Sequence, residues 1–236
     1  QNSTKGHYRA GTATEAWGGR SVIGNKVQNN ALLVTGGTLG AAYGGVIENY
    51  EHLSSGAEKP TGDAAANTLT IRGGSISRAY GADVRTRDGS VTDSHATMAG
   101  GSVTGSLYGG ALTHAGATGT ATGNSVTITG GTVGGDVYAG YTSGTGKTTG
   151  NTVSLGDGTN AVAAGTTVTG VIYGGSAADT TGNVLNVNAK GVTAGSVANF
   201  AKIKFKIDSN VADGDDVLTL TQNTTLAHSS IEEPTP

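Results

Sequence analysis

One unit of sequence recurs six times along this chain, and it constrains the fold more than any other feature. The unit reads N-x-Φ-x-Φ-x-G-G-x-Φ and, after a short gap, Φ-Y-G-G, where Φ is an apolar residue. Its near-copies begin at Asn30, Asn67, Ser94, Asn124, Asn151 and Asn183. Successive tyrosines lie 37, 28, 30 and 35 residues apart, whereas the unit itself keeps its length. A constant body with variable insertions is typical of a solenoid, in which each repeat stacks on its neighbours.

Within each unit the apolar residues alternate with small polar ones. In the fourth copy, Val126 and Ile128 occupy the second and fourth positions after the asparagine, and the other copies follow the same pattern. Alternation over about five residues indicates a half-buried strand. The 42 glycines and the many Thr, Val, Ser and Asn residues disfavour helix. The sequence therefore predicts an all-β fold, a right-handed parallel β-helix (β-solenoid) with coils of about 30 residues and variable inserts.

The recurring glycines and asparagines have expected roles at the corners of each coil. A coil must turn sharply between strands, and glycine adopts positive φ without a steric penalty. Asparagine at one corner has two interpretations that the sequence leaves open. It is either a turn residue, or one rung of a ladder in which stacked amides bond from coil to coil.

The last part of the chain departs from the repeat. Ile203, Phe205 and Ile207 alternate with lysines, which predicts a strand with one solvated face, and a second strand is expected near 217–220. We expect these strands to form a hairpin-like cap over the open end of the stack. The expected organisation is thus a β-helix over 1–200 and, over 201–236, a strand pair followed by an exit linker from Ile231.

Composition and motifs exclude several classes of protein. The chain has no cysteine, so disulfides and cysteine-ligated zinc are absent, and its net charge of −3 without a basic patch argues against nucleic acid. No serine-hydrolase or zinc-protease motif occurs. We expect no catalytic residue, no metal and no cofactor. The only oxygen-rich segment runs from Asp208 to Asp216, and it is either a calcium loop or an Asp/Gly turn.

Five tyrosines occupy the same place in successive coils and are the first candidate binding residues. They are Tyr43, Tyr80, Tyr108, Tyr138 and Tyr173. Each follows an apolar or small residue, so alternation turns the tyrosines outward if those residues face the core. The resulting strip has two interpretations. It is a platform for sugar rings or a partner surface, or it is a structural stack whose rings bury one another.

The inserts supply the second set of candidates. The longest, over 46–66, carries Glu48, Tyr50 and His52 in a much denser set of charges than the repeat body. Arg85 and Arg87, in the next insert, are expected beside it. Loops on a rigid scaffold often carry recognition, although a solvated loop without a partner is the competing interpretation.

The complete repeat, together with the segment from Asn199 to Thr219, resembles the passenger domains of type V autotransporters, which are Gly/Thr/Asn-rich surface proteins of Gram-negative bacteria. The resemblance covers nearly the whole chain. It implies export through the periplasm and across the outer membrane by a C-terminal translocator barrel of a longer chain, and a place on the cell surface. Such passengers are mostly adhesins, and some mediate self-association.

These observations favour a non-enzymatic adhesin fragment that binds a host-cell glycan or protein, or another copy of itself. A passive structural stalk and a polysaccharide-active β-helix enzyme are the alternatives. The sequence fixes a scaffold for all three functions, because function depends on sites that are carried on a fold.

Overall fold

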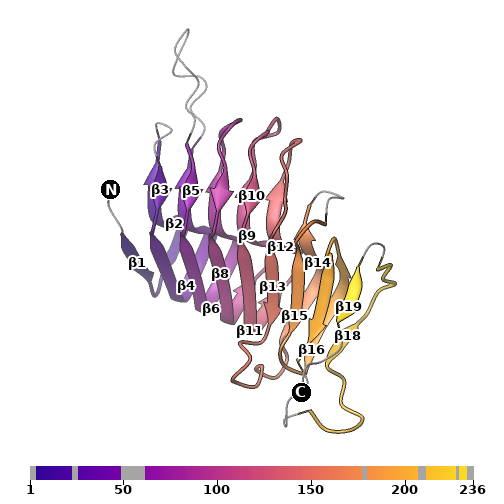
Figure 1. Cartoon of the computed structure of the whole chain (residues 1–236). Coiled ribbons are helices and arrows are strands. Elements are labelled where there is room, and N and C mark those ends of the chain that lie inside the picture. Colours follow the sequence, from indigo (N-terminus) through magenta and orange to yellow (C-terminus); the bar gives the residue numbers. More distant parts are fainter. Residues whose placement is uncertain are drawn as a thin grey trace.

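The computed structural model describes residues 4–22, 26–48, 62–176, 180–206, 211–226 and 229–232. In this part of the chain there are strands and no helix, and every strand pairing is parallel. Fifteen strands make one continuous sheet and four make a second, short sheet. The chain is a parallel β-solenoid of about seven turns, as predicted. The first and last coils lie at opposite ends of the stack (Figure 1).

The strand bounds show how each coil is divided. The large sheet contains β1 (Lys5–Tyr8), β2 (Thr12–Ser21), β4 (Ala31–Ile47), β6 (Thr68–Val84), β8 (His95–Val103), β9 (Leu107–Leu112), β11 (Ser125–Val133), β12 (Val137–Thr142), β13 (Thr152–Leu155), β14 (Thr167–Gly175), β15 (Val184–Val187), β16 (Val192–Ala198), β17 (Lys202–Phe205), β18 (Leu218–Leu220) and β19 (Ser230–Glu232). The short sheet contains β3 (Val27–Gln28), β5 (Ala64–Ala65), β7 (Val91–Thr92) and β10 (Ala121–Thr122).

The alternating apolar residues fill the interior, as their period predicts. Val126 and Ile128 of β11 are buried and lie in register with Val153 and Leu155 of β13. The same columns run through the stack and form one continuous core. Single coils bury too little surface to be stable alone, so the stacking of like residues provides most of the stability.

The recurring asparagines form a buried ladder, which decides between the two interpretations that the sequence left open. The backbone N–H of Asn124 donates to Oδ1 of Asn151 at 3.0 Å, and its side-chain amide donates to the carbonyl of Val91 at 3.2 Å. The rungs are Thr4, Asn30, Asn67, Ser94, Asn124, Asn151 and Asn183. Successive rungs are 26 to 37 residues apart in sequence. From Asn30 to Asn183, the left-handed corner position is taken by the residue before each rung, such as Asp93 or Gly123.

The glycines serve two different purposes. Gly74 and Gly131, in the pair after the first strand of a coil, have φ of +90° and +86°, as the turn argument predicts. The pair that follows Tyr43, Tyr108 and Tyr173 has another role, which the sequence argument missed. A methyl carbon at Gly110 would lie 2.5 Å from Cγ of Asn124, because the strand passes directly over the ladder amide. The second glycine of the pair is therefore required by close approach of the backbone to the ladder. The first has a different neighbour, since a methyl carbon at Gly109 would lie 2.6 Å from the carbonyl oxygen of Ala139 in the next coil.

The segments that follow the tyrosine motif extend to one edge of the solenoid. The strands of the short sheet lie along this edge, where β3, β5 and β10 are seen at the top of the stack (Figure 1). A second small core supports them, with Ile47, Val84, Val91 and Leu112 buried. The variable inserts therefore project from the side that the repeat predicts.

The C-terminal strands do not form the hairpin-like cap that we expected. β17 pairs in parallel with β15, and β18 pairs in parallel with β16, so both strands continue the stack across residue 201. Apolar residues on these strands match the interior columns, and parallel stacking buries them better than a hairpin would. As predicted, Ile203 is buried and Lys202 and Lys204 are exposed.

The prediction that an exit linker begins at Ile231 is also wrong. Ile231 and Glu232 belong to β19, which pairs with β17 in parallel register. The continued alternation of apolar and polar residues lets this segment add one further strand to the stack.

Candidate functional site

The five repeated tyrosines form a continuous stack on the outer face of the solenoid. Neighbouring ring centroids are 4.7 to 5.4 Å apart, and the ring planes are within 12° of parallel. The residues before them, such as Leu107 and Val137, lie in the core, so the tyrosines point outward as predicted. Tyr141 packs edge-on against Tyr108 and Tyr138, at interplanar angles of 71° and 70°.

This geometry supports the structural interpretation of the tyrosine strip. Tyr43 and Tyr80 are 3% and 6% exposed, and the other three rings are partly exposed. Parallel rings at this spacing cover one another's faces. Within the stack, only ring edges and hydroxyl groups are available to a ligand. A sugar ring that required an open tyrosine face would not find one between the coils.

Burial of the stack should be visible in its titration. Burial raises the pKa of Tyr43 to about 12 and raises the pKa of Tyr80 and Tyr138 further. Because the pKa of Tyr43 is higher in the folded than in the unfolded protein, its contribution to the free energy of unfolding is fully present below pH 10. This contribution is lost as the pH rises through about 12. We expect absorbance at 295 nm to show these tyrosines ionising well above pH 10 in the native protein. In urea all tyrosines should ionise near pH 10, and a native titration complete near pH 10 would contradict the stack.

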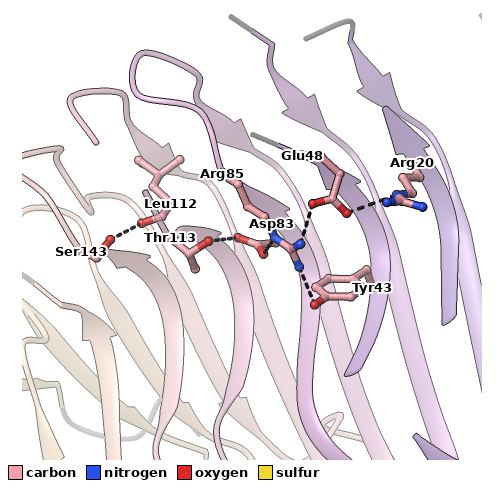
Figure 2. Close-up of polar contacts among 8 residues, drawn as sticks. All are labelled: Arg20, Tyr43, Glu48, Asp83, Arg85, Leu112, Thr113 and Ser143. Carbon is pink, nitrogen blue, oxygen red and sulfur yellow. Dashed lines mark hydrogen bonds and ion pairs between the residues drawn. The ribbon is translucent and has the colours of Figure 1, made fainter. Parts of the chain in front are cut away.

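A chain of ion pairs crosses three coils beside the tyrosines, and a hydrogen bond from Thr113 extends it to a fourth (Figure 2). Nε of Arg20 donates to Oε1 of Glu48 at 3.1 Å, and Nη1 of Arg85 donates to Oε2 of Glu48 at 2.6 Å. Nε of Arg85 donates to Oδ2 of Asp83 at 2.8 Å. The hydroxyl of Thr113 donates to Oδ1 of Asp83 at 2.7 Å. Two arginines and two carboxylates thus neutralise one another.

The ion-pair chain is joined to the tyrosine stack through Arg85. Its Nη2 donates to the Tyr43 hydroxyl at 2.6 Å, and its guanidinium lies 5.1 Å from the centre of the Tyr43 ring. Burial raises the pKa of Asp83, and the adjacent Arg85 opposes that rise. A carboxylate that is 2% exposed is costly to bury without a partner, so Arg85 is the central residue of the network.

The candidates from the inserts have different outcomes. Glu48 and Arg85 lie together, as expected, and contact Tyr43 through the network. Arg87 is exposed on the same segment and takes no part in it. Tyr50 and His52 lie outside the described residues, as does most of the insert over 46–66.

A groove of about 410 Å³ lies over the tyrosine stack and collects residues that the sequence did not single out. It is lined by the edges of Tyr43, Tyr80 and Tyr108 together with Glu15 and Arg78. Neither Glu15 nor Arg78 forms an ion pair with another described residue, and the Arg78 side chain is exposed. Among the described residues that line the groove, Arg78 and Glu15 are thus the charged side chains that do not form an ion pair.

The alternation of inward and outward side chains along the strands could have predicted some of the residues that line the groove. Arg78 lies two residues before Tyr80, so both side chains are on the outer face. Glu15 is in register with Ala41 and Arg78 and follows the same rule. Asp83, Thr113, Tyr141 and Ser143 were missed because they lie where the variable segments begin.

The described residues include no group of three or more His, Asp or Glu side chains placed to hold a metal ion. In the Asp/Gly segment near the C-terminus, Asp215 accepts hydrogen bonds from Nζ of Lys190 and from the backbone N–H of Ala212, both at 2.6 Å. Gly214 adopts φ of +87°, which fits a turn. Asp208 and Asn210 lie outside the described residues.

Among the described residues, no helix is long and apolar enough to span a membrane.

Comparison with protein-family models, curated proteins and solved structures finds no match to this chain.

Proposed function

We propose that this chain is a non-enzymatic binding module on the surface of a Gram-negative bacterium, with the groove over the tyrosine stack as its contact surface. Its partner is a host-cell glycan or protein, or another copy of the chain. The observation that carries the proposal is the combination of phenol edges with the unpaired Arg78 and Glu15 in one groove. Tyrosine and arginine, together with tryptophan, are enriched among the side chains that dominate binding energy at protein interfaces.

The chemistry of the groove favours polar, charge-assisted contacts over ring stacking. The tyrosine faces are occupied by one another, so a ligand meets hydroxyl groups and ring edges. Arg78 suits a carboxylate or another anionic group, since its fork of donors can make two parallel hydrogen bonds. The underlying stack is rigid, which lowers the entropic cost of binding.

The proposed location rests on the resemblance to autotransporter passengers, and the solenoid fold is compatible with it. A long, parallel stack with low charge projects a binding face away from a membrane. The variable edge segments then add further surface beside the groove. A translocator barrel in the same longer protein is part of this proposal.

Replacing Arg78 by alanine tests the groove directly. We expect binding of the labelled chain to cultured epithelial cells to weaken about tenfold, because an anchoring arginine typically contributes more than 1 kcal/mol. Arg72→Ala is the matched control, since Arg72 is exposed on the same strand and does not line the groove. Both variants should unfold at the wild-type temperature.

Two results would oppose the proposal. Equal binding by the Arg78 and Arg72 variants would remove the groove as the contact surface. If no saturable binding to cells occurs at any concentration and sedimentation shows no self-association of the chain, the chain is better described as a passive stalk.

A further inference from the structure

The groove over the tyrosine stack has an entirely polar lining, and this narrows the chemistry of its ligand. Every described residue that lines it carries a hydroxyl group or a charge, and none is an aliphatic residue such as valine or leucine. Its volume of about 410 Å³ lies within the range of small-ligand sites, roughly 300–1,000 Å³. Such sites are usually lined by apolar side chains, which hold the apolar parts of a ligand. A groove without them favours a ligand that is polar over its whole surface.

Tyr80 places a hydroxyl group without a protein partner in this groove. The residue is 6% exposed, and the centre of its ring lies 5.0 Å from that of Tyr43 and 4.7 Å from that of Tyr108. The Tyr43 hydroxyl accepts a hydrogen bond from Arg85, whereas the Tyr80 hydroxyl makes none with another described residue. Burial raises the pKa of Tyr80, so the hydroxyl stays protonated at neutral pH. It is therefore a rigidly held hydrogen-bond donor that is available to a ligand.

Arg78 lies two residues before Tyr80 on β6 and supplies a positive charge to the same groove. Its neighbours in the adjacent coils are small. It is in register with Ala41 on one side, and on the other a methyl carbon at Gly105 would lie 3.6 Å from its Cγ. Because β6 pairs with β4 on one side and with β8 and β9 on the other, these neighbours are set within the interior of the stack. No side chain of the adjacent coils therefore competes with a ligand for the guanidinium.

The groove is suited to a ligand with one negative charge. The other arginine in its lining, Arg85, is shared between Asp83 and Glu48, so Arg78 is the cation that a ligand can reach. Glu15 lies in the same row as Arg78 with one coil between them, where it repels a second negative charge and can accept hydrogen bonds from hydroxyl groups. A guanidinium fork matches a planar carboxylate, since it can donate two parallel hydrogen bonds. This combination favours a single carboxylate on a molecule that is rich in hydroxyl groups.

We propose that the groove binds an acidic sugar, a uronic or sialic acid unit of a glycan, through its carboxylate. This inference rests on the proposed function, because it names the ligand class of the same groove. The guanidinium of Arg78 holds the carboxylate, and the Tyr80 hydroxyl donates a further hydrogen bond to it. Glu15 and the hydroxyl of Tyr141 contact the hydroxyl groups of the sugar ring. A peptide fits less well, since the groove offers no aliphatic pocket for its side chains.

Ligand-observed NMR titration with the methyl glycosides of glucuronic acid and N-acetylneuraminic acid tests the proposal. We expect wild type to bind one or both free acids, and to bind the corresponding methyl esters about tenfold more weakly, because the esters carry no charge for Arg78. In Arg78→Ala this distinction between acid and ester should disappear. The relative affinities of the two acids identify which acidic sugar the groove prefers.

Tyr80→Phe is the more specific variant, because it keeps the ring in the stack and removes only the hydroxyl group. We expect it to bind the acid about tenfold more weakly, since a hydrogen bond to a charged group is lost, and to unfold at the wild-type temperature. Tyr173→Phe is the matched control and should bind as wild type does, because Tyr173 belongs to the same stack but does not line the groove.

The proposal is overturned if the esters bind as well as the acids, if a neutral sugar bearing a sulfate ester binds equally, or if Tyr80→Phe retains wild-type affinity for the acids. If neither acid binds while attachment to cells still requires Arg78, the ligand class is wrong and the groove remains the contact surface of the proposed function. If the acids bind as expected but the chain does not attach to cells, the ligand class stands and attachment to those cells fails.

Discussion

Gly110→Ala is expected to destabilise the protein by about 3 kcal/mol, at the upper end of the cost of overpacking a core. The new methyl group would lie 2.5 Å from Cγ and Oδ1 of Asn124. That amide cannot move away, because it donates to the carbonyl of Val91 and accepts from the backbone N–H of Ser94. Urea denaturation measures the loss as a change in the free energy of unfolding.

The third coil indicates which second substitution should compensate for the destabilisation by Gly110→Ala. There the position equivalent to Gly110 is Ala82, and the ladder rung is Ser94 instead of asparagine. The shorter rung leaves room for the methyl group of alanine. We therefore expect Asn124→Ser to be destabilising alone but to restore much of the stability of Gly110→Ala in the double variant.

Gly116→Ala is the matched control for this cycle. Its new methyl group would meet no atom closer than 3.4 Å, and the nearest is the mobile end of Arg87. We expect its stability to be within about 0.5 kcal/mol of wild type. Strict additivity of Gly110→Ala and Asn124→Ser would show that the two positions do not share space, contrary to the structure.

Arg85→Ala is expected to cost a further large amount of stability, about 3 kcal/mol. The substitution leaves Asp83 and Glu48 without their shared cation and removes the donor to Tyr43. Thermal or urea unfolding at pH 7 measures this loss. Arg87→Ala, two residues away and exposed, should change the free energy of unfolding by no more than about 0.5 kcal/mol.

The cost of Arg85→Ala should depend on pH in a defined direction. Burial raises the pKa of Asp83 above its ordinary value of 3.8, and removing Arg85 removes an opposing influence. A raised folded pKa gives stability that is present below 3.8 and lost as the pH rises through the folded pKa. The variant's deficit should thus be largest at pH 7 and shrink towards pH 4. A deficit that grows as the pH falls would contradict a buried, unpaired Asp83.

The repeat made most of the scaffold predictable. The alternation in residues such as Val126 and Ile128 defines the inward face, and the recurrence of tyrosine predicts a strip on the outer face. These are local periodicities, so they can be read without knowing which segments meet. The asparagine ladder was one of two open interpretations, because an isolated asparagine has the same preference for a corner in either case.

The functional face was harder to predict because its contacts join different coils. Arg85 meets Glu48 across 37 residues of sequence, and an insert of irregular length separates them. Asp83 and Thr113 were missed for the same reason, since variable segments hide the register of the residues that follow them. The hairpin expected at the C-terminus was wrong because the alternation of Ile203 and Phe205 fits a stacked parallel strand equally well.

The sequence by itself determined the coil, its apolar interior and the positions of its tyrosines, because each depends on a short pattern repeated in every unit. Only the tertiary structure decided what the outward residues contact. It closed the tyrosine faces against one another, paired Arg85 with two carboxylates, and left Arg78 and Glu15 in an open groove. The physical reason is that lateral neighbours in a solenoid are set by the register between coils, which the variable inserts separate in sequence but not in space.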